Sequence, residues 1–103
     1  MRSTTYAALW SDGDTPLAGS LALDGEALQF EGSRPGRHAR RRISYEEIVS
    51  LRLGRENGER LRGRTALVIE LDDGTTVRVV TAEPGTIHEV IDALTDVQRK
   101  VRS

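Results

Sequence analysis

The chain contains no cysteine and no long apolar segment. The lack of cysteine excludes disulfides, zinc–thiolate sites and thiol nucleophiles. The longest uninterrupted apolar run covers residues 66–69, whereas a transmembrane helix needs roughly 20 such residues. Residues 1–6 carry an arginine but no apolar stretch of the kind that a secretory signal contains, so we expect a cytoplasmic location.

Aromatic side chains are also scarce, and the core must therefore be built from leucine, valine and isoleucine. Hydrophobic residues make up 37% of the 103 residues, which predicts one globular domain spanning residues 1–103. Tyr6 and Trp10 fall four residues apart on a predicted strand at residues 5–10, so they share one face. The sequence alone leaves open whether Trp10 is a core residue or part of an exposed contact surface.

Charge is balanced overall but concentrated locally. The formal net charge is −1, which argues against a general nucleic-acid-coating protein. Residues 34–42 nevertheless contain five arginines and no acid: Arg34, Arg37, Arg40, Arg41 and Arg42. They form a candidate anion or partner patch, because guanidinium groups match phosphates and carboxylates. The simpler interpretation, which we favour, is that they are solvated loop and edge-strand charges that also block edge pairing. No aromatic residue interrupts the run, which disfavours single-stranded nucleic acid as a partner.

Turn signals recur at the spacing of short strands, which predicts a small antiparallel β fold. We expect a first hairpin with a two-residue type I′ turn at Asp24-Gly25, placing Leu21 opposite Leu28. A second hairpin should turn through residues 72–74, with Gly74 in the left-handed conformation. This three-residue loop places Ile69 opposite Val77 and Leu67 opposite Val79, whereas a two-residue loop would separate the apolar residues onto opposite faces.

Between these hairpins we expect a strand ending near Ile43, a one-turn corner at residues 44–47 and a strand at residues 48–53. A polar loop should follow at residues 54–64, with a possible turn at Asn57-Gly58. The C-terminal residues then change to helical periodicity. Thr86 is the predicted N-cap, with Glu89 completing a capping box. We expect this amphipathic helix to cover the open end of a small barrel.

The order of these elements resembles the pleckstrin-homology-like superfamily, in particular its GRAM-type and bacterial members. The residues that carry the resemblance lie at positions 19–25, 28–30 and 43–51. The resemblance implies a mainly β fold, a barrel of about seven antiparallel strands capped by one C-terminal helix. It also implies a non-catalytic module that binds lipid headgroups, peptides or proteins. The loop at residues 11–16 is acidic where phosphoinositide-binding members are basic, so no lipid-binding residue is carried over from the family.

Nothing in the sequence predicts an enzyme, a metal site or a cofactor. His38 lies within the arginine run and His88 in the first turn of the predicted helix, and neither has a nucleophile and an orienting acid beside it in the sequence. The loop starting at Asp12 lacks the ligand spacing of a calcium-binding loop. We therefore expect a non-enzymatic interaction module with a protein or peptide partner. The alternatives are peripheral binding to anionic lipid or another polyanion through arginine-rich loops at residues 34–42 and 52–64, and homo-oligomers that pair through an edge strand.

Overall fold

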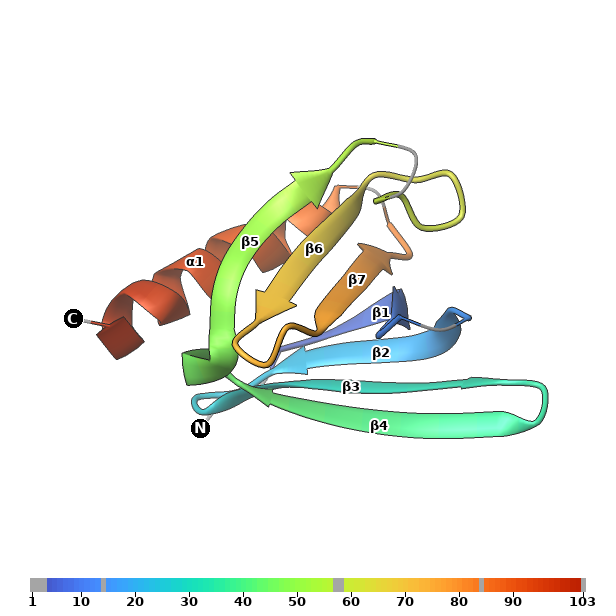
Figure 1. Cartoon of the computed structure of the whole chain (residues 1–103), viewed down its shortest axis with the longest axis horizontal. Coiled ribbons are helices and arrows are strands. Elements are labelled where there is room, and N and C mark those ends of the chain that lie inside the picture. The colour runs from blue at the N-terminus through green and yellow to red at the C-terminus, as the bar shows by residue number, and fades with distance from the viewer. Residues whose placement is uncertain (1–3, 14, 57–58, 84, 103) are drawn as a thin grey trace.

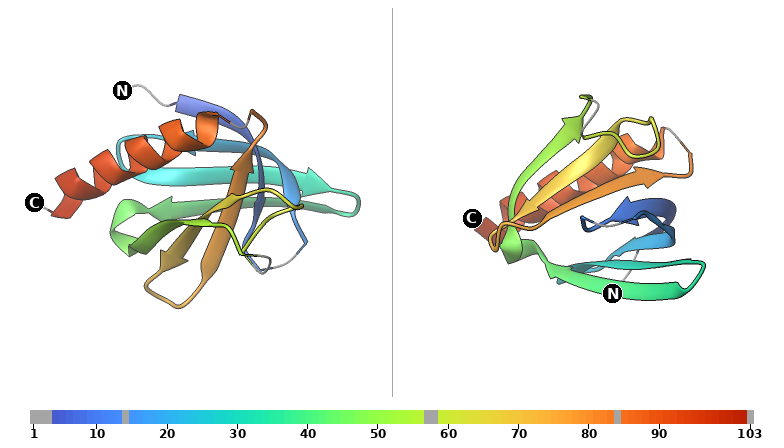
Figure 2. Two further views of the ribbon diagram at one scale, coloured as in Figure 1. Left: turned by 90° about the horizontal axis from the view of Figure 1, so that it is seen from above. Right: turned by 45° about the vertical axis from the view of Figure 1, so that its right-hand side comes forward.

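Seven antiparallel strands and one C-terminal helix make up the structure, a computed structural model that describes residues 4–13, 15–56, 59–83 and 85–102. The predicted fold class is confirmed. The strands form one sheet in the order β4-β3-β2-β1-β7-β6-β5, and this sheet curls into a half-barrel (Figures 1 and 2). The elements are β1 (Thr4–Ser11), β2 (Leu17–Leu23), β3 (Ala27–Arg34), β4 (Arg37–Ser44), η1 (Tyr45–Glu47), β5 (Ile48–Gly54), β6 (Ala66–Leu71), β7 (Thr76–Thr81) and α1 (Thr86–Arg102).

The two edges of the sheet, β4 and β5, are joined by the short 3-10 helix η1, where we predicted a corner. The backbone N–H of Ser44 donates to Glu47 Oε2 at 2.7 Å, which stabilises the start of this turn. The Tyr45 hydroxyl donates to the carbonyl of Asp24 at 2.6 Å. The corner is thereby tied to the β2–β3 turn, and β4 and β5 diverge from it along opposite sides of the half-barrel (Figure 1).

The β6–β7 hairpin has the predicted register. Ile69 lies opposite Val77 and Leu67 opposite Val79. Gly74 adopts a φ of +89°, which glycine reaches without the steric cost of a side chain. The predicted turn at Asn57-Gly58 lies outside the described residues.

The β2–β3 hairpin differs from the predicted register by two residues. Leu21 pairs with Phe30 and Leu23 with Leu28, so the loop has four residues and the predicted type I′ turn at Asp24-Gly25 was wrong. Asp24 Oδ1 accepts the backbone N–H groups of Glu26 and Ala27 at 2.7 and 2.8 Å. These hydrogen bonds lower the pKa of Asp24 and hold the longer loop.

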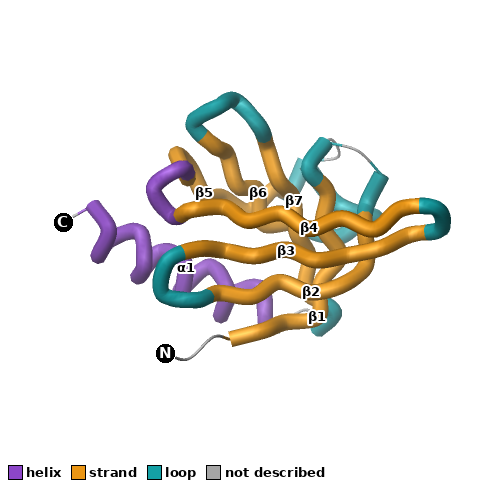
Figure 3. Tube along the Cα trace, turned by 90° about the horizontal axis from the view of Figure 1, so that it is seen from below, coloured by secondary structure: helices purple, strands orange, loops and turns teal. Residues whose placement is uncertain are grey.

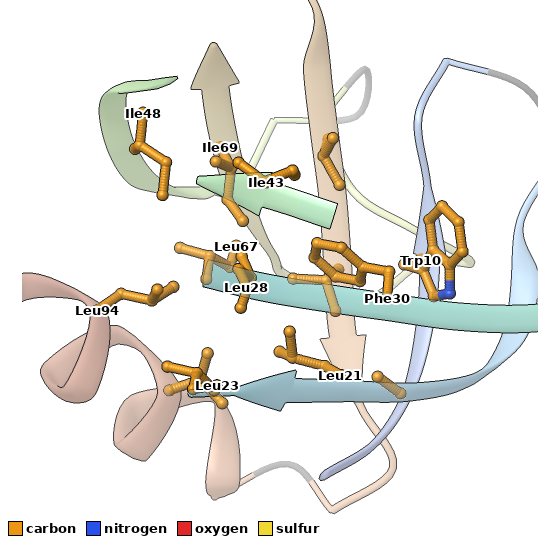
Figure 4. Close-up of a cluster of buried hydrophobic side chains, with 14 of the residues drawn as sticks. Trp10, Leu21, Leu23, Leu28, Phe30, Ile43, Ile48, Leu67, Ile69 and Leu94 are labelled. Carbon is orange, nitrogen blue, oxygen red and sulfur yellow. The ribbon is translucent and has the colours of Figure 1, made fainter. Parts of the chain in front are cut away.

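The core is mainly aliphatic, as the composition predicts, around a contact between Trp10 and Phe30 (Figure 4), and Tyr45 is also buried in it. Trp10 is fully buried, which answers the question that the sequence left open. Its ring centroid lies 5.1 Å from that of Phe30, and its Nε1 donates to the Glu31 carbonyl at 3.1 Å. A Cβ on Gly32 would come within 2.8 Å of Trp10 Nε1. This position of β3 therefore needs glycine so that the indole can pack against the strand.

Helix α1 covers one end of the half-barrel with a buried stripe made of Ile87, Val90 and Leu94. The helix begins at Thr86, so Thr86 is its first residue and not its N-cap. The Thr86 hydroxyl donates to the Glu83 carbonyl at 2.6 Å. No helix in the described part of the chain is long and apolar enough to cross a membrane.

Candidate binding site at the arginine-rich edge strand

All five candidate arginines lie on strands and not in a loop, and four of them lie on the edge strand β4. Arg34 ends β3, a tight turn with Gly36 at φ +80° follows, and Arg37, Arg40, Arg41 and Arg42 lie on β4. Strand β4 pairs with β3 along its whole length and stands at the end of the strand order. Figure 3 shows it as the outermost strand of the β1–β4 layer. Most of the arginine patch therefore coincides with a free sheet edge.

The alternation of the strand divides the run between two faces. Arg41 lies opposite the buried Phe30, so Arg37 and Arg41 face inward and are half-buried. His38, Arg40 and Arg42 face outward and are exposed. The structure thus brings Arg40 and Arg42 together on one face and separates them from the other arginines.

Carboxylates from other parts of the chain lie beside each side of the run. Outside, Glu31 Oε2 is 3.4 Å from Arg40 Nε and Glu31 Oε1 is 3.6 Å from His38 Nε2. Arg42 Nη2 lies 3.6 Å from Glu26 Oε2. These side chains are at least half exposed, and such surface pairs contribute about 0–1 kcal/mol each. Sequence reasoning could not identify these partners, because their proximity depends on the β3–β4 register.

On the inner face, Arg41 lies across the open side of the half-barrel. Its Nη1 is 3.9 Å from Asp12 Oδ2 in the acidic β1–β2 loop. Hydrogen bonds from Thr75 lower the pKa of Asp73 in the β6–β7 turn, and the charge of Arg41 lowers it further. The Nε atoms of Arg34 and Arg41 are buried, and neither has a hydrogen-bond partner in the described part of the chain. Two buried guanidinium nitrogens beside the edge strand therefore lack a hydrogen-bond acceptor among the described residues.

Next to the outer arginines is a shallow basin of about 480 Å³. Its floor contains the small side chains of Ser20 and Ala22 on β2, and Arg40 and Arg42 stand along its margin with Gln29 and Glu31. Sequence reasoning missed the β2 and β3 residues of this basin. The β2 residues could have been expected on the outer face, because Ser20 and Ala22 alternate along the strand with the buried leucines.

The two histidines are both exposed, His38 on β4 and His88 on α1. Among the described residues no group of three or more acidic or histidine side chains is arranged to hold a metal ion. The groups that the structure does assemble on β4 are guanidinium groups, backbone amides and carbonyls. Such groups bind and orient a ligand.

Comparison with known proteins shows the fold. No family model matches the chain, and no curated protein matches it. Among solved structures, the C-terminal domain of an unknown protein from Leishmania infantum is similar, with a TM-score of 0.68 and 14% identity over 88% of this chain and 80% of that one. A chain of the 8S snRNP assembly intermediate has a TM-score of 0.70 and 13% identity over 96% of this chain and 81% of that one. The curled antiparallel sheet with a C-terminal helix is compatible with a pleckstrin-homology-like fold.

Proposed function

We propose that the chain is a non-enzymatic interaction module of the pleckstrin-homology-like type that binds an extended acidic segment of a partner protein along β4. The observation that carries the proposal is the coincidence of the arginine run with a free sheet edge. An edge strand presents unpaired backbone N–H and C=O groups. An added peptide strand uses these groups for affinity and the neighbouring side chains for specificity.

The side chains of β4 specify the charge of that segment. Arg40 and Arg42 project on one face and Arg37 and Arg41 on the other. A segment paired with β4 would therefore meet guanidinium groups at successive positions on both of its faces. Opposite charges directly across a strand pair contribute about 0.2–1 kcal/mol each. An acidic partner strand would form several such pairs with β4.

The same reasoning disfavours a homodimer through β4. Two copies of this strand would bring arginines against arginines, and like charges directly opposite each other are destabilising. The existing pairs with Glu31 and Glu26 are exposed and long, so an incoming carboxylate can replace them at small cost. Both observations favour a second, acidic chain as the partner.

An anionic membrane is the competing ligand. A flat lipid surface gains nothing from the backbone edge of β4. A neighbour of the same fold is a chain of an assembly intermediate, which agrees with a protein-binding role.

The test measures fluorescence anisotropy of a labelled peptide of alternating glutamate and valine. A lysine–valine peptide of the same length tests charge, and a glutamate–valine peptide with alternate N-methyl groups tests the backbone edge. Arg40→Glu combined with Arg42→Glu should weaken binding of the acidic peptide about tenfold or more, since two attractive pairs become repulsive. Arg55→Glu with Arg99→Glu makes the same change of net charge at exposed sites away from β4.

Equal weakening by the control variant would show that net charge alone governs binding, which contradicts the proposal. Equal affinity for the N-methylated peptide would show that the backbone edge is not used, which also contradicts it. Vesicles of phosphatidylcholine and phosphatidylserine form the last arm. If they bind the chain in a manner that depends on Arg40 and Arg42 while the peptide does not bind, the membrane reading replaces the protein-binding one.

A further inference from the structure

A second cavity lies on the outer face of β1, β2 and β7, and β3 stands between this part of the sheet and the β4 edge in the strand order. It is a groove of about 440 Å³, within the range of small-molecule binding sites. Ten residues line it, and they come from β1, β2, β7, the residue after β7 and the turn at residues 61–64. All but three of these are alanine, glycine, leucine or valine.

The floor of the groove follows from the strand register. Leu9 on β1 lies opposite Ala18 on β2 and opposite Val80 on β7. Leu9 also packs against a small cluster formed by Leu61, Ala66 and Val80, outside the main core. Small side chains on β1 and β2 therefore leave room beside a larger apolar wall, and an apolar ligand would find a continuous surface there.

The turn at residues 61–64 supplies the charged wall. Its two backbone hydrogen bonds join Leu61 and Arg64, each at 3.0 Å. Arg62 has a φ of +52° and Gly63 a φ of +77°. A residue other than glycine, asparagine or aspartate is uncommon in this left-handed region. Leu61 is buried and anchors the turn against the sheet, so the turn holds Arg62 and Arg64 at the groove.

These two arginines differ from the outer arginines of β4. Arg40 and Arg42 each have a carboxylate within 4 Å. Neither Arg62 nor Arg64 forms an ion pair with any residue that the structure describes. The groove therefore combines an apolar floor with two guanidinium groups that have no carboxylate partner in this part of the chain.

We propose that this groove binds a small amphipathic carboxylate. The apolar chain would lie on Leu9, Ala18 and Val80, and the carboxylate would be held by Arg62 and Arg64. Guanidinium groups bind carboxylates through paired, charge-assisted hydrogen bonds. The complementarity of one apolar floor and two cations selects a ligand with one apolar body and one anionic end. The groove is separate from the β4 edge, so this proposal does not rest on the proposed strand addition there.

The experiment titrates the 103-residue chain with octanoate and follows amide resonances by two-dimensional NMR. Octan-1-ol and octylammonium have the same chain with a neutral and a cationic head. We expect octanoate to shift resonances of Ala7, Leu9, Ala18 and Val80. We expect weaker binding of octan-1-ol and no saturable binding of octylammonium at these resonances.

Arg62→Gln combined with Arg64→Gln should weaken octanoate binding about tenfold or more and leave octan-1-ol binding unchanged. Arg55→Gln with Arg99→Gln, which removes two charges outside the groove, should leave both unchanged. Ala18→Leu places a larger side chain on the exposed floor and should abolish binding of both ligands. The spectrum of each variant reports its fold in the same experiment.

The proposal is overturned if octylammonium binds as well as octanoate, if the double glutamine variant retains octanoate affinity, or if the shifts lie elsewhere. Retained octanoate binding in Ala18→Leu also overturns it. The acidic peptide serves as an internal reference, because Arg62→Gln with Arg64→Gln should leave its binding at β4 unchanged. Failure of one site therefore does not imply failure of the other.

Discussion

Replacing Gly32 with alanine should destabilise the protein through contact with Trp10. The added Cβ would lie 2.8 Å from Trp10 Nε1 and 2.9 Å from Leu17 Cβ, both shorter than ordinary van der Waals contacts. Overpacking in a core typically costs about 1–3 kcal/mol. Displacing the indole would also weaken its hydrogen bond to the Glu31 carbonyl, a net term of about 1 kcal/mol. Alanine also has less conformational freedom than glycine in the unfolded chain, which offsets about 0.4–1 kcal/mol of this cost. We expect a net loss of about 2 kcal/mol.

Urea unfolding measures this loss directly. Trp10 is the single tryptophan and lies at the site of the change, so its fluorescence reports the transition. The matched control is Ser33→Ala on the exposed side of the same strand, which should change stability by less than about 0.5 kcal/mol. An unfolding midpoint for Gly32→Ala equal to that of the control would refute the reasoning.

A double-mutant cycle then identifies the contact that causes the loss. Trp10→Phe replaces the indole by a smaller ring and removes Nε1, so the cost of Gly32→Ala should be smaller in that background. Circular dichroism follows unfolding there, since the tryptophan is gone. Residues in contact show coupling of about 0.5–3 kcal/mol. Strict additivity would show that the indole is not the obstacle.

Two further predictions concern the helix and the corner. Leu94→Ala removes a fully buried side chain and should lower the free energy of unfolding by about 2–5 kcal/mol. Thr95→Ala, at the exposed neighbouring position, is the control in the same urea experiment. An equal effect of the two substitutions would contradict the prediction. Burial, followed by the charge of Asp24, raises the pKa of Tyr45 from 10.0 to about 12. The folded state therefore keeps a proton that the unfolded state loses, so the stability from this group is full below pH 10.0 and falls as pH rises toward 12. Tyr45→Phe should flatten this alkaline decline of the urea midpoint, and an unchanged slope would contradict the assignment.

The two hairpins show how far a hydrophobic pattern predicts a fold. A shift of one residue in the β6–β7 hairpin would place Ile69 and Val77 on opposite faces, so the pattern determined this register. A shift of two residues in the β2–β3 hairpin keeps all apolar side chains on the same face. The pattern could not distinguish the two registers, and the Asp24 side chain, which holds the four-residue loop, decided between them.

The arginine run shows a different limit. Its composition indicated a charged patch, but whether it lay in a loop or along an edge depended on strand pairing. The carboxylates beside it come from β3, from the β2–β3 turn and from the β1–β2 loop. Those contacts connect residues about 10–30 positions apart, and a single sequence does not place them.

The groove beside Arg62 and Arg64 could not be found from the sequence as a site. One signal was available, because Leu61 is a lone apolar residue in an otherwise polar loop. An apolar side chain in such a place is often buried, as Leu61 is. Its position would have shown that the loop folds back onto the sheet, although not onto which strands.

The place of β1 in the sheet also determines when the fold can be completed during synthesis. Strand β1 pairs with β2 on one side and with β7 on the other. The strands β1–β4 and β5–β7 each form from neighbouring hairpins, which close short loops. The β1–β7 pairing alone joins these two groups, and it must wait until Thr81 has left the ribosome. Until β7 is available, the second edge of β1 therefore has no strand partner from this sheet.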